Sequence, residues 1–495
     1  MLRSLIVIIY LLGIIALSSA RCPRFRWGDP DCPISVSLPL TFNRVLSPEE
    51  FRLRACCARK AQIDPEYVVF PDPALTELSS ARDTQLIPNV FNPYLTASPM
   101  AIAGSRVFVS ASGSWDVVTG NQVPEGVERV NYAYENMYRL ARAIGAYPED
   151  FVQLTVLAKG TESTLFNDYR TRANNLTSAT YGSVQVTLPG REFIGVAAIE
   201  GKSPSDQNSF STVGEFFLGC SGLERWNLPC NITQSIATIV TQTPETQDGR
   251  NRFLTNRIRA FVENGTCNWV SPPQAIRVNT AWDNIITREG TYLNSQPGLV
   301  GKVTPDRVIR VEAWAVSYNF TANDTFNKIK QYLGPNKYPV LRYLQVQNLA
   351  QQDIYELGLN YWTGPGNLVY NVDRPFAPLG FYSNAIRAGD YVYTTAFGGH
   401  NPNTRELVSE ADRVSQAYEN MLSAAAVLGA DHTDLAFVEA VTTSLVRDQP
   451  LIDAVTRQIF GATGPYPARS FYQQPAVYFG QTFEICGIFY APTCR

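Results

Sequence analysis

A nine-residue phrase that occurs three times constrains the fold of this chain more than any other feature. It reads RVNYAYENM at 129–137, RVNTAWDNI at 277–285 and RVSQAYENM at 413–421. The copies lie too far apart for a solenoid, whose units are only about 20–50 residues long. The chain has 495 residues, and a domain takes roughly 150 residues. The repeat therefore indicates three whole domains copied in tandem.

The same order of segments surrounds each copy. Within the first copy, Val130, Tyr134 and Met137 fall on one face of a helix. Stretches rich in β-branched and aromatic residues precede the phrase at 106–111, 215–220 and 391–396, and follow it at 149–158, 306–316 and 433–443. An amphipathic segment and two strands close each unit. Each unit is predicted as β-β-α-β-α-β-β, an α+β layer pair in which the phrase packs a helix and carries no chemistry.

The spacing of the copies divides the chain into unequal parts. We predict a leader, a Cys-rich extension and three modules, at 1–20, 21–87, 88–203, 204–366 and 367–495. The second module is stretched by an insertion at about 223–270, which holds two cysteines and two sequons. We expect a glycosylated excursion there, with a functional lid as the alternative.

The first twenty residues have the pattern of a secretory signal. Arg3 precedes an apolar stretch from Leu5 to Leu17, and Ser18 and Ala20 are small residues where a signal peptidase reads. We expect cleavage after Ala20 and secretion, with an uncleaved anchor as the alternative. No later apolar run reaches the roughly 18 residues of a membrane span, so no membrane contact is expected after cleavage. The net charge of −3 gives no reason to expect nucleic acid.

Cysteines and sequons agree with an exported protein. An oxidising compartment favours disulfides, and an odd count leaves one cysteine free or paired with another chain. The nine candidates are Cys22, Cys32, Cys56, Cys57, Cys220, Cys230, Cys267, Cys486 and Cys494. Five N-x-S/T sequons are candidate glycosylation sites, at Asn175, Asn231, Asn264, Asn319 and Asn323.

The third module resembles a known family. It reads GFYSNAIRAGDYVYTTA at 380–396, YPARS at 466–470 and FEICGIFYA at 483–491. This combination resembles the RidA/YjgF family of imine and enamine deaminases, and the other two modules resemble it more loosely. Members are small chains that assemble as trimers with ligand sites between neighbours. The resemblance implies a chorismate-mutase-like fold and an intramolecular pseudo-trimer, monomeric in solution, with three clefts.

By this resemblance, Arg469 and Glu484 are the candidate catalytic residues. A planar guanidinium grips a carboxylate through two charge-assisted bonds, and a carboxylate beside an imine positions water and relays protons. Tyr382, Thr395 and Asp453 match the family's substrate-binding positions. Asp453 stands where the family has Asn, and its charge would repel an anionic substrate.

The other two modules depart from the family at the same positions. The arginine position is predicted to hold Tyr181 in the first module and Leu341 in the second. The carboxylate position is predicted to hold Gly195 and Glu356. At most one cleft is therefore expected to keep both main residues.

Two functions remain open. An enzyme would hydrolyse 2-imino or 2-enamino acids to keto acids and ammonia, and would need no metal or cofactor because such compounds are already electrophilic. Only two histidines occur, His400 and His432, so a multi-histidine zinc site is not expected. The alternative is a secreted binding or structural protein with one cleft for a small carboxylate-bearing molecule.

Overall fold

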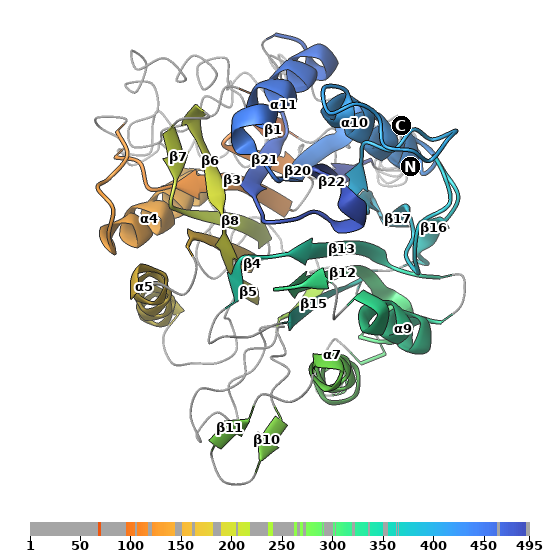
Figure 1. The fold of residues 1–495 in the computed structure, drawn as a ribbon, viewed down its shortest axis with the longest axis horizontal. Helices are drawn as coiled ribbons and strands as arrows, with labels where there is room; N and C mark the ends of the chain where they lie inside the picture. The colour runs from red at the N-terminus through yellow and green to blue at the C-terminus, as the bar shows by residue number, and fades with distance from the viewer. Residues whose placement is uncertain are drawn as a thin grey trace, which may run out of the picture.

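A computed structural model describes the fold over the parts of the chain that follow. They are residues 68–70, 96–103, 106–116, 121–143, 151–160, 164–181, 190–203, 206–217, 236–240, 262–264, 268–270, 274–289, 291, 300–301, 303–318, 322–334, 337–349, 355–362, 364, 366–462 and 466–491. Most strands gather in the middle of the molecule, and three pairs of helices lie on its periphery (Figure 1). The fold class is mixed α+β, as predicted.

The first sheet has the order β1-β2-β3-β8-β4-β5-β14. Its strands are β1 (Val68–Phe70), β2 (Met100–Ala103), β3 (Arg106–Gly113), β4 (Phe151–Lys159), β5 (Gly190–Val196), β8 (Phe210–Phe217) and the two-residue β14 (Asn348–Leu349). β4 and β5 are parallel, and the other pairs are antiparallel. Helices α4 (Glu128–Ala143) and α5 (Thr164–Tyr181) belong to the same stretch of chain.

The second sheet has the order β13-β12-β15-β9. Its strands are β9 (Ile236–Val240), β12 (Val308–Ala315), β13 (Val340–Gln345) and β15 (Tyr355–Trp362). Its helices are α7 (Gln274–Asp283), which continues as the π-helix η4 (Asn284–Glu289), and α9 (Ala322–Leu333). A separate hairpin joins β10 (Val262–Asn264) to β11 (Asn268–Val270).

The third sheet runs β16-β17-β18-β22-β20-β21, and β6 and β7 extend it. Its strands are β16 (Val369–Asn371), β17 (Ala385–Ala388), β18 (Tyr391–Thr394), β19 (Phe397–Gly398), β20 (Leu435–Thr442), β21 (Ala468–Gln473) and β22 (Phe483–Tyr490). The two strands added from the first part of the chain are β6 (Ala198–Ser203) and β7 (Asp206–Asn208). Its helices are α10 (Arg413–Ala426) and α11 (Leu445–Phe460).

The repeated phrase packs its helix in the same way in the first and third copies. Val130, Tyr134 and Met137 are buried, as predicted. The asparagine of the phrase makes the same pair of hydrogen bonds to backbone carbonyls in both copies. Asn420 Nδ2 donates to the carbonyls of Gly398 and His400 at 3.0 and 2.8 Å. Asn136 Nδ2 donates to those of Gly113 and Trp115 at 3.0 and 2.9 Å. The motif therefore ties each helix to the chain that leaves the preceding strand.

The three sheets exchange edge contacts in a closed cycle. In the first step, Ala198 of the first part pairs with Gln473 on β21 of the third sheet. Asn348 of the second part pairs with Gly195 on β5 of the first sheet. The cycle closes where Ala476 of the third part forms a bridge to Gln345 on β13 of the second sheet. In each step, the segment that follows the parallel strand of one sheet joins the end of the corresponding strand in another sheet.

One predicted strand belongs to a different sheet from the one expected. The stretch 215–220 was assigned as the opening strand of the second module, but β8 pairs with β3 and β4 of the first sheet. β9, inside the predicted insertion at 223–270, instead pairs with β15 of the second sheet. The division after 203 therefore separates β8 from its own sheet. A β-rich stretch does not reveal its partner, because strand pairing is decided by contacts far along the chain.

Several predicted features fall outside the described residues. These are the leader at 1–20, almost all of the extension at 21–87, every cysteine except Cys486, and the sequons Asn231 and Asn319. Cys486 is buried on β22 as a free thiol, which removes it from the nine disulfide candidates and agrees with the expectation that an odd count leaves a cysteine unpaired. No helix within the described parts is long and apolar enough to cross a membrane.

Candidate functional site

The strand registers identify the equivalent positions in the three sheets. On the parallel strand, Arg469 lies opposite Val438, Leu341 opposite Val311, and Arg191 opposite Leu154. These three central-strand residues occupy the same place in their sheets, so Arg191, and not Tyr181, holds the arginine position of the first sheet. Tyr181 is the last residue of α5.

The carboxylate position is found in the same way on the neighbouring antiparallel strand. Glu484 lies opposite Val441, Glu356 opposite Trp314, and Ser211 opposite Leu157. The first sheet thus has Ser211 there, and the prediction of Gly195 was wrong. Gly195 lies on β5, where it pairs with Asn348.

Arg469 lies at the junction of the third and first sheets, and groups of the protein itself surround it. Its backbone N–H donates to Ser110 Oγ on β3 at 2.7 Å. Its guanidinium binds both carboxylate oxygens of Glu200 on β6, with Nε to Oε2 at 3.2 Å, and also reaches Thr96 Oγ1 at 2.9 Å and Asp453 Oδ1 at 3.0 Å. Arg469 is only 2% exposed. The carboxylate of Glu200 therefore makes the bidentate contact with Arg469 that the carboxylate of a ligand was expected to make.

The charge around Arg469 also disfavours a further anion. Two carboxyl groups, Glu200 and Asp453, already face one guanidinium. Burial raises the pKa of Glu200 to about 7, against the attraction of Arg469, and the nearby Asp453 adds to the rise. A third carboxylate would enter a site whose positive charge is already balanced.

Glu484 lines a separate cleft at the junction of the second and third sheets. The second sheet contributes Leu341 and Tyr343, and the third contributes Tyr382, Thr395 and Glu484. Thr395 Oγ1 donates to the carbonyl of Leu341 at 2.7 Å, which joins the two sheets at the floor of the cleft. Burial raises the pKa of Glu484 well above its usual range, and Arg342 opposes this rise.

The structure does not bring the two predicted catalytic residues together. Arg469 belongs to the junction with the first sheet, whereas Glu484 faces Leu341 of the second. No hydrogen bond or ion pair joins Arg469 to Glu484 within the described structure. Of the predicted binding residues, Asp453 lies with Arg469, and Tyr382 and Thr395 lie with Glu484. The hypothesis that one cleft holds all five residues is therefore corrected.

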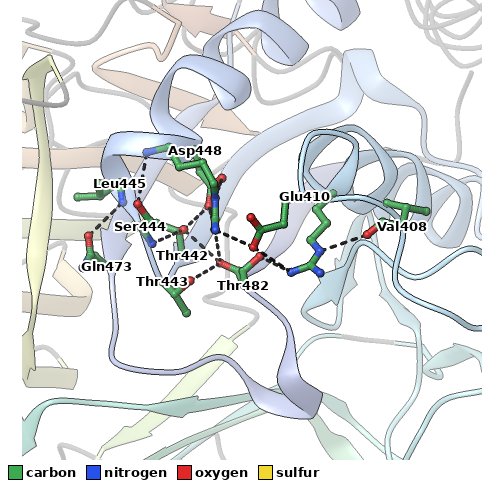
Figure 2. A network of polar contacts seen from close by, with 11 residues as sticks. Val408, Glu410, Thr442, Thr443, Ser444, Leu445, Asp448, Gln473 and Thr482 are labelled. Atoms are coloured by element: carbon green, nitrogen blue, oxygen red, sulfur yellow. Dashed lines mark hydrogen bonds and ion pairs between the residues drawn. The ribbon is translucent and has the colours of Figure 1, made fainter.

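A polar network fixes the chain segment beside Glu484 (Figure 2). Thr442 Oγ1 and Arg447 Nη2 both donate to the carbonyl of Thr482, at 3.1 and 3.5 Å. Arg413 of the repeated phrase donates to Thr482 Oγ1 at 2.6 Å. Arg447 also binds Asp448 in the first turn of α11, with Nε to Oδ1 at 2.7 Å. The start of α11 and the repeated phrase thereby hold the Gln481–Glu484 edge of the cleft.

Other predicted sites are placed as follows. Asn175 on α5 and Asn323 on α9 are exposed, and Asn264 lies on β10. Among the described residues there is no group of three or more His, Cys, Asp or Glu side chains able to hold a metal ion. Sequence reasoning missed Glu200, because its contact with Arg469 joins strands far apart in the chain. It also missed Gln481, whose amide donates to Glu484 three residues along the chain.

The recurring order of parallel strand, central strand and antiparallel neighbour in the three described sheets defines a protein of the mixed α+β class. The chain is 33% identical over 103 residues to the 2-iminobutanoate/2-iminopropanoate deaminase of Dermatophagoides farinae, which covers 20% of this chain and 78% of that protein. It is 31% identical over 119 residues to the chloroplastic Reactive Intermediate Deaminase A of Arabidopsis thaliana, which covers 24% of this chain and 62% of that one. The chain belongs to the RidA/YjgF family.

Solved structures with the same likeness each match about a quarter of the chain. RidA from an Antarctic Psychrobacter is 31% identical and covers 24% of this chain and 97% of its own, with a TM-score of 0.22. A probable translation initiation inhibitor from Rhodopseudomonas palustris is 33% identical and covers 26% and 100%, with a TM-score of 0.25. No family model matches the chain.

Proposed function

We propose that the chain is a pseudo-trimer of three RidA-like modules within one polypeptide. Two observations support this. The core order of parallel strand, central strand and antiparallel neighbour recurs in all three sheets as β5-β4-β8, β13-β12-β15 and β21-β20-β22. The edge contacts between sheets close a cycle of three. Because the three proposed modules lie in one polypeptide, we expect the protein to be a monomer in solution. Sedimentation of the purified chain would test this expectation.

The proposed activity is hydrolysis of 2-imino or 2-enamino acids to 2-keto acids and ammonia, at the junction of the first and second sheets. β5 of the first sheet packs beside β9 of the second, as β21 packs beside β3. This junction combines Arg191 at the arginine position with Glu356 at the carboxylate position. Of the three junctions in the described structure, this one alone has an arginine at the arginine position and a carboxylate at the carboxylate position. This observation carries the proposal.

Each of the other two junctions has only one of the two residue types, either the arginine or the carboxylate. The second–third junction combines Leu341 with Glu484, and so has no guanidinium to grip a carboxylate. The third–first junction combines Arg469 with Ser211, and Glu200 already occupies the guanidinium. In the proposed mechanism, Arg191 orients the substrate carboxylate, and Glu356 positions water and transfers protons.

An assay with imino acids tests this proposal. An amino-acid oxidase generates the imine in situ, and its decay is followed with and without the purified protein. We expect Arg191→Leu and Glu356→Gln each to lower the rate by about 100-fold or more, the usual contribution of such groups. Glu484→Gln, the matched substitution in another cleft, should leave the rate unchanged. No acceleration by the unaltered protein, or a rate lost only in Glu484→Gln, would refute the proposal.

We also propose that the protein is secreted and glycosylated. The apolar leader pattern supports this, as does the exposure of Asn175 and Asn323 on the helix surfaces. Expression in a secretory cell, followed by glycosidase treatment of the medium, tests the proposal. A protein retained in the cell with no change in mobility would contradict it.

A further inference from the structure

The hairpin of β6 and β7, here called the strap, lies beside β21 at the junction of the third and first sheets (Figure 1). Backbone pairing joins β6 to β21 as far as Ile199. Beyond Ile199, Arg469 on β21 donates to the carboxyl group of Glu200. Gln449 on α11 donates to the carbonyl of Gly201 at 2.9 Å. In the described structure, side chains thus hold the outer part of the strap to the third sheet.

The cluster beneath the strap has two carboxyl groups and one cation. Nη2 of Arg469 bonds both Glu200 Oε1 and Asp453 Oδ1, the latter at 3.0 Å. Tyr418 on α10 also interacts with Glu200, and burial raises the pKa of its phenol, which therefore stays neutral. One buried positive charge does not balance two negative charges, so one carboxyl group is expected to keep a proton. Glu200, at 0% exposed against 8% for Asp453, is the more buried of the two and is that group.

The proton on Glu200 links the strap to pH. In the closed structure, burial raises the pKa of Glu200 from 4.5 to about 7, which agrees with the charge balance of the cluster. When the strap opens and water reaches the carboxyl group, its pKa falls back toward 4.5, the value of the free side chain. Between these two values the closed form holds a proton that the open form has lost. A rise in pH through this range therefore favours the open form.

We propose that the strap is a proton-sensitive closure of the junction between the third and first sheets. While Glu200 keeps its proton, the strap lies closed against Arg469 and Asp453. Loss of this proton releases the outer part of the strap, and water then reaches the guanidinium of Arg469. The proposal concerns a different junction from the proposed deaminase site, so the two proposals stand or fall separately.

Hydrogen exchange of the full chain, followed by mass spectrometry at about pH 5 and about pH 8, tests the proposal. Protection factors report opening because they correct for the intrinsic pH dependence of exchange. We expect those of the β6 amides to be at least about 10-fold lower at the higher pH, since one pKa unit changes the equilibrium up to tenfold. Glu200→Gln cannot titrate and should remove this difference. Glu215→Gln, the matched change in the buried pair with Arg106, should leave it in place.

Low concentrations of urea separate opening of the strap from unfolding of the whole molecule. Local opening exposes little surface, so urea should leave the exchange of β6 nearly unchanged while it accelerates that of β20. Equal protection factors of β6 at both pH values in the unaltered protein would overturn the proposal, as would a pH response that persists in Glu200→Gln. A urea dependence of β6 equal to that of β20 would overturn it as well, because the strap would then open only with the entire fold.

Discussion

Arg469 stands at the position that the family resemblance assigns to carboxylate binding, but groups of the protein itself surround its guanidinium. The guanidinium donates to both carboxylate oxygens of Glu200, as it would to a bound carboxylate, and it also donates to Thr96 and Asp453. A buried ion pair stabilises little by itself, but removal of one partner is strongly destabilising because the other is left as an unpaired buried charge. Replacement of Arg469 would therefore disturb folding and could not by itself diagnose catalysis.

Glu200 should make stability depend on pH. The pKa of Glu200 is about 7 in the folded protein against 4.5 for the free side chain. Between these values the folded state keeps a proton that the unfolded state has lost, so stability falls as pH rises from 4.5 through 7. The slope is at most about 1.4 kcal/mol per pH unit. Denaturant unfolding across this range should show the slope in the unaltered protein and a smaller one in Glu200→Gln. Equal slopes in both proteins would contradict this assignment.

At the scale of elements, the asparagine of the repeated phrase is expected to stabilise two helices by the same contact. Asn420→Ala and Asn136→Ala each leave two carbonyls without their donor. Each substitution should lower the free energy of unfolding by about 1–3 kcal/mol. Glu419→Ala, an exposed neighbour on α10, should change it by no more than about 0.5 kcal/mol. Chemical denaturation measures all three, and equal stability of Asn420→Ala and Glu419→Ala would refute the shared task.

The elements themselves could be read from local pattern. The strands predicted at 149–158, 306–316 and 433–443 are β4, β12 and β20, and the phrase forms helices in all three copies. Periodicity identifies such elements because it reflects one buried face. It does not identify partners, which is why 215–220 was assigned to the wrong sheet.

The site was less predictable than the fold for the same reason. YPARS located Arg469, but its partner Glu200 lies on a strand from another part of the chain. In the first part of the chain, the sequence SVQVTL at 183–188 predicts a strand directly after Tyr181, so Tyr181 was assigned to the arginine position. The pairing of β4 with β5 places Arg191 at that position instead.

At the scale of the whole molecule, buried polar groups join the three sheets at their meeting point. Gln153 of the first sheet donates to Glu312 Oε2 of the second at 3.0 Å. Arg342 of the second sheet pairs with Glu439 of the third. Arg106 of the first sheet binds Tyr393 of the third. Residues of all three sheets line one small cavity there, so the sheets should unfold together.

Arg342 is the residue whose loss should weaken this coupling most. It bonds Glu312 Oε1 at 3.2 Å within its own sheet and reaches Glu439 and Tyr472 across the junction. Arg342→Met leaves Glu439 buried without that cation, and should lower the free energy of unfolding by about 3–5 kcal/mol. The double variant Arg342→Met with Glu439→Leu removes both charges, and should recover much of the loss. Urea unfolding followed by tryptophan fluorescence and by circular dichroism measures both quantities. A double variant no more stable than Arg342→Met would show that this pair does not hold the second and third sheets together.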